Sequence, residues 1–413
     1  MTKDSRLAKI YPWIVVGLLW VVALLNYMDR QMLSTMREAM SLDIAELASA
    51  ERFGALMAVF LWIYGIVSPF GGAVADRLSR KWLIIASLGV WSAVTLLMGH
   101  CHNYTQIYWL RALMGISEAL YIPAGLSLIS DYHEGKSRSF AIGVHMTGLY
   151  IGQAAGGFGA RFAEAISWQS TFHWFGLVGL AYAVVLAICL HDKKSEGPAS
   201  EAAPAAENIP VMKGFAMIFA NISFWVILFF FASSSLPGWA TKNWLPTLFA
   251  GTLGIPMADA GPISTITIAA SSFVGVMIGG PISDRWVKKN LKGRIYTSSI
   301  GFALMIPALI LIGLGHSLFT VVAAGICFGV GYGMFDTNNM PILCQFVPKK
   351  LRATAYGLMN MVGVFAGAAC TTVLGRWADK GQLGLAFAVL AVLVALALTL
   401  ELTVLKPTTD NME

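Results

Sequence analysis

The stretch Gly71-Gly72-Ala73-Val74-Ala75-Asp76-Arg77 ends a long apolar run with an acid and a base, and it recurs once in the chain. The second copy is Gly279-Gly280-Pro281-Ile282-Ser283-Asp284-Arg285, with Gly, Gly, Asp and Arg at a constant offset of 208 residues. A pattern that returns at about half the length of a 413-residue chain indicates an internal duplication. The sequence therefore predicts two related halves.

The composition around these two copies is that of a membrane protein. Hydrophobic residues make up 57% of the chain and charged residues 12%, whereas a soluble domain carries about 25% charged residues. This balance excludes a disordered chain, a disulfide scaffold and a cytosolic enzyme. The five cysteines lie far apart without C-x-x-C spacing, so we expect neither a redox centre nor a bound metal.

Membrane spans of roughly 20 apolar residues can be marked along the whole chain. They predict an all-α membrane protein with twelve transmembrane helices in two six-helix pseudo-symmetric halves. The expected domains are an N-terminal bundle (1–191), a polar cytoplasmic linker (192–213) and a C-terminal bundle (214–413). The predicted spans are 12–34, 52–73, 82–99, 106–129, 139–161, 169–190, 216–250, 262–283, 296–315, 317–341, 355–376 and 384–404.

The seventh span is too long for one straight crossing. It contains Pro237 and Pro246, so we expect a kinked helix followed by an exit loop. The residues Trp239, Lys242, Asn243 and Trp244 near its end are candidates for an outer gate, although Lys242 could also extend to the membrane surface.

The basic residues predict the orientation. With the N-terminus inside, 20 of the 28 Lys and Arg residues fall in cytoplasmic loops, which predicts cytoplasmic N- and C-termini. The net charge of +6 is then largely an insertion signal, and no nucleic-acid partner is needed to explain it. We expect a monomer in the cell's inner (cytoplasmic) membrane, surrounded by lipid.

Few ionisable residues remain at membrane depth once the loops are set aside. Each costs roughly 2.5–3.5 kcal/mol at mid-membrane on insertion scales, so each is a candidate for function. They are Asp29, Arg30, Arg111, Glu118, Lys242, Asp336 and Glu401.

Four of these charges are expected to form pairs in the N-terminal half. Arg111 and Glu118 are seven residues apart, so they share one face of a helix. The expected depths pair Asp29 with Arg111 and Arg30 with Glu118. Burial favours the neutral form of Glu118 and Arg30 favours its carboxylate, so the residue is suited to exchange a proton. The alternative is a static network that only holds helices together.

The first repeated stretch, read as Gly72-x-x-x-Asp76-Arg77-x-x-Arg80-Lys81, resembles the signature loop of the major facilitator superfamily, apart from Ser79, where glycine is usual. The resemblance implies that superfamily's twelve-helix fold and alternating access. Asp76 could cap a helix N-terminus and Arg77 could pair with a carboxylate, which would latch one conformation. The alternative is that these residues serve only as positively charged anchors on the inner side of the membrane. The candidate latch residues are Gly72, Asp76, Arg77, Arg80, Asp284 and Arg285.

A narrower resemblance comes from Asn26-Tyr27-Met28-Asp29-Arg30, Arg111–Ala119 with Pro123, Tyr64, and Trp244-Leu-Pro246-Thr247. These stretches are similar to the anion:cation symporter family, which includes sialin and sugar-acid carriers. The first two are also similar to spinster lysolipid transporters.

The symporter resemblance implies roles for single residues. Asp29 and Glu118 would carry protons, Arg30 would meet the substrate carboxylate, and Arg111 would hold Asp29. The substrate-binding residues that it implies are Tyr27, Arg30, Tyr64 and Arg111.

Weaker candidates lie on other spans. His145 falls where sugar-acid carriers commonly have an aromatic residue, and it either touches substrate or faces the bundle. Asp336, Asn338 and Asn339 either read sugar hydroxyls or satisfy backbone groups of a broken helix. Glycines at four-residue spacing on span 5 predict a closely packed face, and they lack the Gly-Pro pair that resembles an antiporter signature. They are Gly148, Gly152 and Gly156.

These features favour a proton-coupled symporter of an organic anion, such as sialic acid, a hexuronate or an aldonate, with the proton as the coupling ion and no cofactor. One alternative is a spinster-like lysolipid or sphingoid exporter. We find no nucleophile–base set or metal cluster at membrane depth, which argues against an enzyme. A non-transporting nutrient sensor would carry a sizeable cytoplasmic domain, whereas the linker is only 22 residues long.

Overall fold

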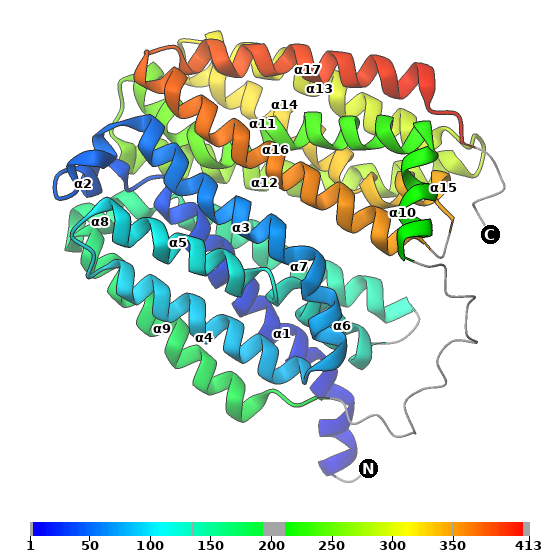
Figure 1. Ribbon diagram of the computed structural model, residues 1–413, viewed down its shortest axis with the longest axis horizontal. Helices are drawn as coiled ribbons and strands as arrows, with labels where there is room; N and C mark the ends of the chain where they lie inside the picture. Colours follow the sequence, from blue (N-terminus) through cyan, green and yellow to red (C-terminus); the bar gives the residue numbers. More distant parts are fainter. Residues whose placement is uncertain (1–2, 134–135, 193–210, 349–350, 408–413) are drawn as a thin grey trace. The chain divides into compact units, whose positions relative to one another are not determined.

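Figure 1 shows the computed structural model of the 413-residue chain, which describes residues 3–133, 136–192, 211–348 and 351–407. Every regular element in these ranges is a helix. The prediction of an all-α protein is confirmed.

Eleven helical stretches among the described residues are long and apolar enough to cross a membrane. They coincide with eleven of the twelve predicted spans. The remaining span, 139–161, falls on helix α7 (Lys136–Gly156), whose hydropathy is lowered by side chains such as His145 and Gln153. The protein is therefore a multi-pass membrane protein.

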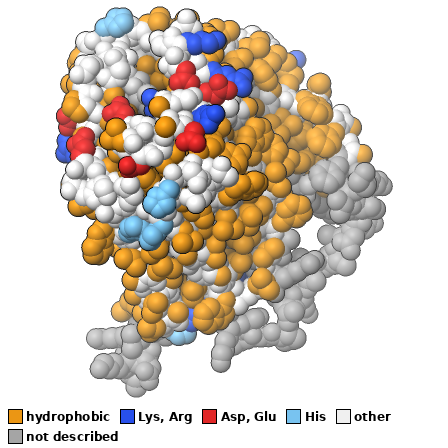
Figure 2. Space-filling model, turned by 60° about the vertical axis from the view of Figure 1, so that its left-hand side comes forward, with side chains coloured by type: hydrophobic (Ala, Val, Ile, Leu, Met, Phe, Trp, Pro, Cys, Tyr) orange, Lys and Arg blue, Asp and Glu red, His pale blue; other side chains and the backbone are white. Residues whose placement is uncertain are grey.

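The surface agrees with this conclusion. Large apolar side chains are exposed on several helices; Trp109 is 66% exposed, Trp174 62% and Phe319 84%. On the face drawn in Figure 2, the charged side chains gather in one region and hydrophobic side chains cover most of the rest. A water-soluble protein rarely exposes so much contiguous apolar surface, whereas a bilayer covers it.

The first of two compact units comprises residues 1–193, 242–269 and 371–380. Within it α7 packs along α1, α9 packs along α4, and α5 packs against α3. Its helices are α1 (Lys3–Leu33), α2 (Arg37–Ser41), η1 (Ala45–Ala48), α3 (Ala50–Arg77), α4 (Arg80–Met98), α5 (Tyr104–Glu118), α6 (Tyr121–Tyr132), α7, α8 (Gly159–Ile166) and α9 (Trp168–Cys189), together with stretches of α11, α12 and α16.

The second unit comprises residues 194–241, 270–370 and 381–413. Its helix α13 packs against α14 and α17, and the rings of Phe230, Phe302 and Phe335 lie with centroids 4.7–5.3 Å apart in its core. The predicted linker 192–213 lies mostly outside the described residues. The helices are α10 (Val211–Ala220), α11 (Ile222–Leu253), α12 (Met257–Val287), α13 (Gly293–Leu314), α14 (Leu318–Asp336), α15 (Asn339–Phe346), α16 (Arg352–Asp379) and α17 (Leu383–Val404).

Two spans are broken in the same way, one in each half of the sequence. Helix α5 ends at Glu118, five residues before Pro123, and helix α14 ends at Asp336, five residues before Pro341. Proline has no N–H, so the carbonyl four residues before it receives no helical hydrogen bond. The duplication therefore places an acid at a helix break in each half.

Helix α11 corrects one prediction. The expected exit loop is absent, because α11 runs without a break from Ile222 through Pro246 to Leu253. Pro246 cannot bond the carbonyl of Lys242, but the side-chain Nε2 of Gln31 on α1 donates to that carbonyl at 2.7 Å. A side chain from another helix thus satisfies the group that the proline leaves open.

The glycine face of α7 is closely packed, as predicted, and the structure shows that its partner is α1. A Cβ atom at Gly148 would lie 2.7 Å from the carbonyl oxygen of Trp20, and one at Gly156 would lie 2.7 Å from that of Met28. These contacts are with backbone atoms, which cannot move aside as a flexible side chain would.

Replacement of Gly152 by valine is expected to destabilise the protein by roughly 1–3 kcal/mol, because its Cβ would overlap the backbone of Leu24. Thermal unfolding in detergent measures the change. Gly143→Val on the same helix is the matched control, since a Cβ at Gly143 meets no atom within 4 Å, and it should change stability much less. Equal unfolding temperatures for the two variants would contradict the close packing.

Candidate functional site

The four charged residues predicted in the N-terminal half lie in the first unit, three of them buried and Arg30 partly buried. Asp29 and Arg30 lie near the end of α1, and Arg111 and Glu118 lie on α5. Glu118 is fully buried, Arg111 is 3% exposed and Asp29 8%. Two acids and one arginine are thus buried within the helical bundle, with a second arginine beside them.

Arg30 and Glu118 form an ion pair, as the sequence predicted. The guanidinium donates through Nε to Glu118 Oε2, and the same oxygen accepts a hydrogen bond from Asn26 Nδ2 at 2.9 Å. The other oxygen, Oε1, is buried without a hydrogen-bond partner. A proton could therefore bind at Oε1 without breaking either bond.

Three aromatic rings surround the Arg30 guanidinium. Its Cζ lies 5.1 Å from the centroid of Tyr27, 4.8 Å from that of Phe60 and 4.9 Å from that of Tyr64. Ring faces attract a cation without neutralising its charge. Because Nη2 is buried and has no hydrogen-bond partner, Arg30 keeps a donor for an incoming anion.

The second expected pair is not a direct ion pair. Asp29 Oδ2 accepts a hydrogen bond from Thr95 Oγ1 on α4 at 2.5 Å, and its Oδ1 has no partner. Arg111 instead lies 4.8 Å from the centroid of Phe60 and donates through Nη1 to Met114 Sδ at 3.0 Å. The Thr95 hydroxyl therefore donates the hydrogen bond to Asp29 that the sequence led us to expect from the Arg111 guanidinium.

Sequence reasoning missed two residues of this site. Phe60 contacts both arginines and lies one helical turn before Tyr64, so the four-residue spacing on α3 could have indicated it. Thr95 lies in an apolar stretch of α4 and carries no signal of its own. Asn26 was recognised only as part of a motif.

His145 is fully buried on α7, with its ring centroid 6.1 Å from that of Tyr121. Tyr121 in turn donates to the carbonyl of Leu19 at 2.9 Å. The ring therefore faces the interior of the bundle, and contact with a substrate stays a prediction.

The polar residues of the second unit stabilise the break between α14 and α15. Asn338 donates to the carbonyl of Met334 at 2.8 Å and accepts from Ser283 Oγ at 2.5 Å. Asn339 Nδ2 donates to Asp336 Oδ1 at 3.3 Å, and Asp336 is exposed. The bonds of Asn338 are those of a residue that supports a broken helix.

The side chains of the predicted latch residues Gly72, Asp76 and Arg77 lie outside the described set. Arg80 forms an ion pair with Asp131 at the end of α6, and it joins two helices of the first unit. In the second copy of the repeated stretch, Asp284 Oδ1 lies 3.5 Å from Arg294 Nη2, and Arg285 is exposed. The latch stays a prediction.

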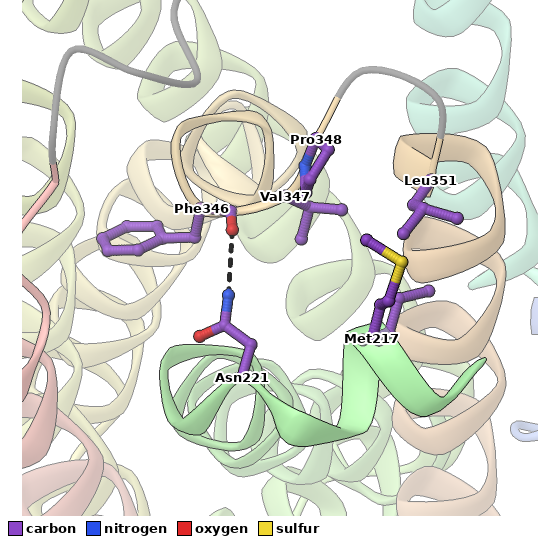
Figure 3. A pocket seen from close by; sticks show the side chains of 7 residues that line it. Met217, Asn221, Phe346, Val347, Pro348 and Leu351 are labelled. Carbon is purple, nitrogen blue, oxygen red and sulfur yellow. Dashed lines mark hydrogen bonds between the residues drawn. The ribbon is translucent and has the colours of Figure 1, made fainter. Parts of the chain in front are cut away.

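A separate cavity of about 200 Å³ lies in the second unit between α10 and the end of α15 (Figure 3). Its wall is mainly apolar, and Asn221 Nδ2 donates across it to the carbonyl of Phe346 at 3.0 Å. None of the described residues that line it carries a charge. In the described ranges, no three His, Cys, Asp or Glu side chains gather as metal ligands would.

A duplicated, multi-pass helical bundle with acids and arginines buried inside it has the architecture of a secondary transporter. Comparison with known proteins agrees: the sequence profile of the Major Facilitator Superfamily matches residues 19–371, and the chain belongs to that superfamily.

The chain is similar to two curated transporters and to one solved structure. The "Probable L-galactonate transporter" of Escherichia coli (strain K12) is 25% identical over 79% of this chain and 77% of its own. The voltage-gated purine nucleotide uniporter SLC17A9 of Rattus norvegicus is 24% identical over 88% and 83%. A bacterial homologue of the human lysosomal transporter Spinster, solved inward-facing and unoccupied, matches the fold with a TM-score of 0.80 at 18% identity over 95% and 96%.

Proposed function

We propose that this superfamily transporter is a proton-coupled symporter of an organic anion, a carboxylated sugar above all, that works by alternating access. The observation that carries the proposal is the Arg30–Glu118 pair, in which each partner keeps one unbonded polar atom. The similarity to the "Probable L-galactonate transporter" supports a sugar acid as substrate.

Arg30 is the anion-binding group in this proposal. Its ring cage holds the guanidinium in place, and Nη2 donates to a carboxylate that enters beside Glu118. Tyr27 and Tyr64 bring hydroxyl groups to the same place, where they donate to the carboxylate or to sugar hydroxyls.

Competition for Arg30 couples the proton to the anion. An incoming carboxylate draws Arg30 away from Glu118, and a buried carboxylate that loses its cation binds a proton more tightly. The proton binds at Oε1, where no hydrogen bond has to break. Anion and proton then favour each other's binding, which is thermodynamic linkage. Asp29 also carries an unbonded oxygen, Oδ1, which makes it a second candidate to carry a proton.

The positive-inside bias supports a place in the cell's inner membrane with both termini in the cytoplasm. Import driven by an inward proton gradient fits that orientation. The expected partners are the small organic anion and the lipid bilayer, and the transporter acts as a monomer.

Uptake into proteoliposomes tests the proposal. The panel contains a sialic acid, a hexuronate, an aldonate, a purine nucleotide and a lysolipid, each measured with and without an inward pH gradient. We expect a sugar acid to accumulate only with the gradient. Lysolipid movement alone would favour the exporter, and uptake that follows membrane voltage but not pH would favour a uniporter; either result overturns symport.

Replacement of Thr95 by valine is expected to move the pH profile of uptake toward higher pH by about one unit. The Thr95 hydroxyl stabilises the ionised carboxylate of Asp29, and a hydrogen bond to a charged group contributes about 1.5–3 kcal/mol. Thr95→Ser, which keeps the hydroxyl, should retain the original profile. If Thr95→Val lowers the uptake rate at every pH without shifting the pH profile, Thr95 only supports packing.

A further inference from the structure

The ring of Phe60 on α3 contacts both arginines of the candidate site. Arg30 Cζ and Arg111 Cζ each lie 4.8 Å from its centroid, and Phe60 is only 1% exposed. A ring face attracts a cation most strongly where water is excluded. Phe60 therefore stabilises two positive charges at once. It has no hydroxyl group, so it acts on them through its ring alone.

Gly115 on α5 allows this ring to lie where it does. A Cβ at Gly115 would lie 2.7 Å from the carbonyl oxygen of Phe60 and 3.2 Å from the backbone nitrogen of Tyr64, so the backbones of α3 and α5 are in close contact here. Gly115 comes four residues after Arg111 and three before Glu118, on the same helix face. Phe60 thus packs against α5 between the positions of Arg111 and Glu118.

Neutral groups hold Arg111 in place. Besides its contact with the Phe60 ring, the guanidinium donates through Nη1 to the thioether sulfur of Met114, which is a weak acceptor. Its Nε is buried without a hydrogen-bond partner. Both acids of the site attract this guanidinium, Glu118 more strongly than Asp29. Arg111 therefore has a donor and an attraction directed to Glu118, while its contacts keep it at the ring.

A second cation near Glu118 matters for the proposed coupling. When an anion draws Arg30 away, Glu118 binds a proton more tightly only as long as no other cation takes the place of Arg30. Besides Arg30, the charged or titratable side chains that act on Glu118 are Asp29 from α1, Tyr64 from α3 and Arg111 from its own helix. Arg111 is the cation in this group.

The other neighbouring helices present different groups. Helix α4 contributes the neutral hydroxyl of Thr95, which bonds Asp29. Tyr121 at the start of α6 donates to the carbonyl of Leu19. Lys242 on α11 lies at the ring of Tyr27, with Nζ 5.8 Å from its centroid.

We propose that Phe60 is a positioning residue for proton coupling: its ring holds Arg111, so that Arg111 does not neutralise Glu118 when the anion draws Arg30 away. This inference rests on the proposed function and adds to it the device that keeps the coupling strict. Without the ring, Arg111 would pair with Glu118, and the anion would bind without its proton.

Equilibrium binding to the purified full-length transporter tests the inference at a series of pH values, with a hexuronate and an aldonate as probe anions. In the wild type, one proton taken up with each anion tightens binding about tenfold for each unit by which the pH is lowered. In Phe60→Leu the change should fall below about threefold per unit, because Arg111 then replaces the proton at Glu118. In Phe60→Leu/Arg111→Gln that cation is gone, so the larger change should return.

Fluorinated phenylalanines at position 60 separate the charge of the ring from its shape. Mono-, di- and trifluorination progressively weaken the attraction of a ring face for a cation, whereas the size of the ring hardly changes. The pH dependence of binding should fall stepwise along this series, which also tests the inference should Phe60→Leu fail to fold. The same series at Phe53 is the matched control and should change nothing, since Phe53 lies on the same helix, is equally buried and packs against Trp244.

An unchanged pH dependence along the series at position 60 would refute the role of the ring. A double variant whose binding stays independent of pH would refute the role of Arg111 and show that Phe60 only supports packing. The proposed function stands in both cases. A wild type that binds neither probe anion, or binds both equally at every pH, would overturn the proposed symport and this inference with it.

Discussion

Replacement of Arg30 by glutamine is expected to lower anion uptake at least 100-fold. Arg30 is the partner of a fully buried carboxylate, and removal of one partner of a buried ion pair costs about 3–5 kcal/mol. The same change removes the Nη2 donor proposed to meet the substrate. Initial uptake rates and equilibrium binding in proteoliposomes measure the loss.

Arg30→Lys should fall between the wild type and Arg30→Gln. Lysine keeps the positive charge, but its ammonium cannot lie flat against three rings while it also bonds Glu118. We expect a loss of about tenfold. A full-strength Arg30→Lys would mean that charge alone, without the planar guanidinium, suffices for binding.

A double variant separates binding from stability. In Arg30→Gln/Glu118→Gln neither buried charge is left alone, so thermal stability should recover most of what the single change removes. Anion binding should not recover. Recovery of both would show that Arg30 serves only to neutralise Glu118. The exposed Arg52→Gln is the control for removal of a positive charge and should leave uptake unchanged.

The sequence predicted the helical fold because its signals are local and repeated. Spans of roughly 20 apolar residues mark helices, and the offset of 208 residues marks the duplication. Hydropathy is averaged over many residues, however, so it cannot show whether the helix is broken within one span. The ends of α5 and α14 depend on whether a carbonyl left open by Pro123 or Pro341 finds another donor.

The same reasoning explains the error at α11. A proline inside an apolar run predicts a kink or a loop, and the outcome depends on the environment of the open carbonyl. At Lys242 a glutamine from a helix more than 200 residues away fills it. No sequence spacing reports such a contact, because it joins two distant parts of the chain.

The sequence predicted which charged residues form the cluster, but it predicted only some of the interactions between them. Seven-residue spacing places Arg111 and Glu118 on one face of α5, and depth along α1 correctly pairs Arg30 with Glu118. The hydrogen-bond partner of Asp29 was not predicted, because Thr95 comes from a third helix and a neutral hydroxyl does not stand out in an apolar sequence. Residues of ordinary apolar type, such as Phe60, are found only once the helices are packed.

Glu118→Gln is expected to abolish accumulation against a gradient while substrate exchange across the membrane continues. Glutamine has nearly the shape of the protonated acid and can still accept from Arg30 and Asn26, but it cannot release a proton. Arg30 is then free to bind the anion in every cycle. Transport becomes a passive equilibration that no longer follows the pH gradient.

Two assays on the same proteoliposomes measure this split. With an inward gradient of one pH unit, one coupled proton supports a concentration ratio of up to about ten, because one unit corresponds to about 1.4 kcal/mol. The wild type should approach that ratio, and Glu118→Gln should stay near one while it keeps counterflow of preloaded substrate. The exposed Glu164→Gln on α8 should behave as the wild type. A Glu118→Gln transporter that still concentrates its substrate would place the coupling proton elsewhere, and Asp29 with its unbonded Oδ1 would be the next residue to replace.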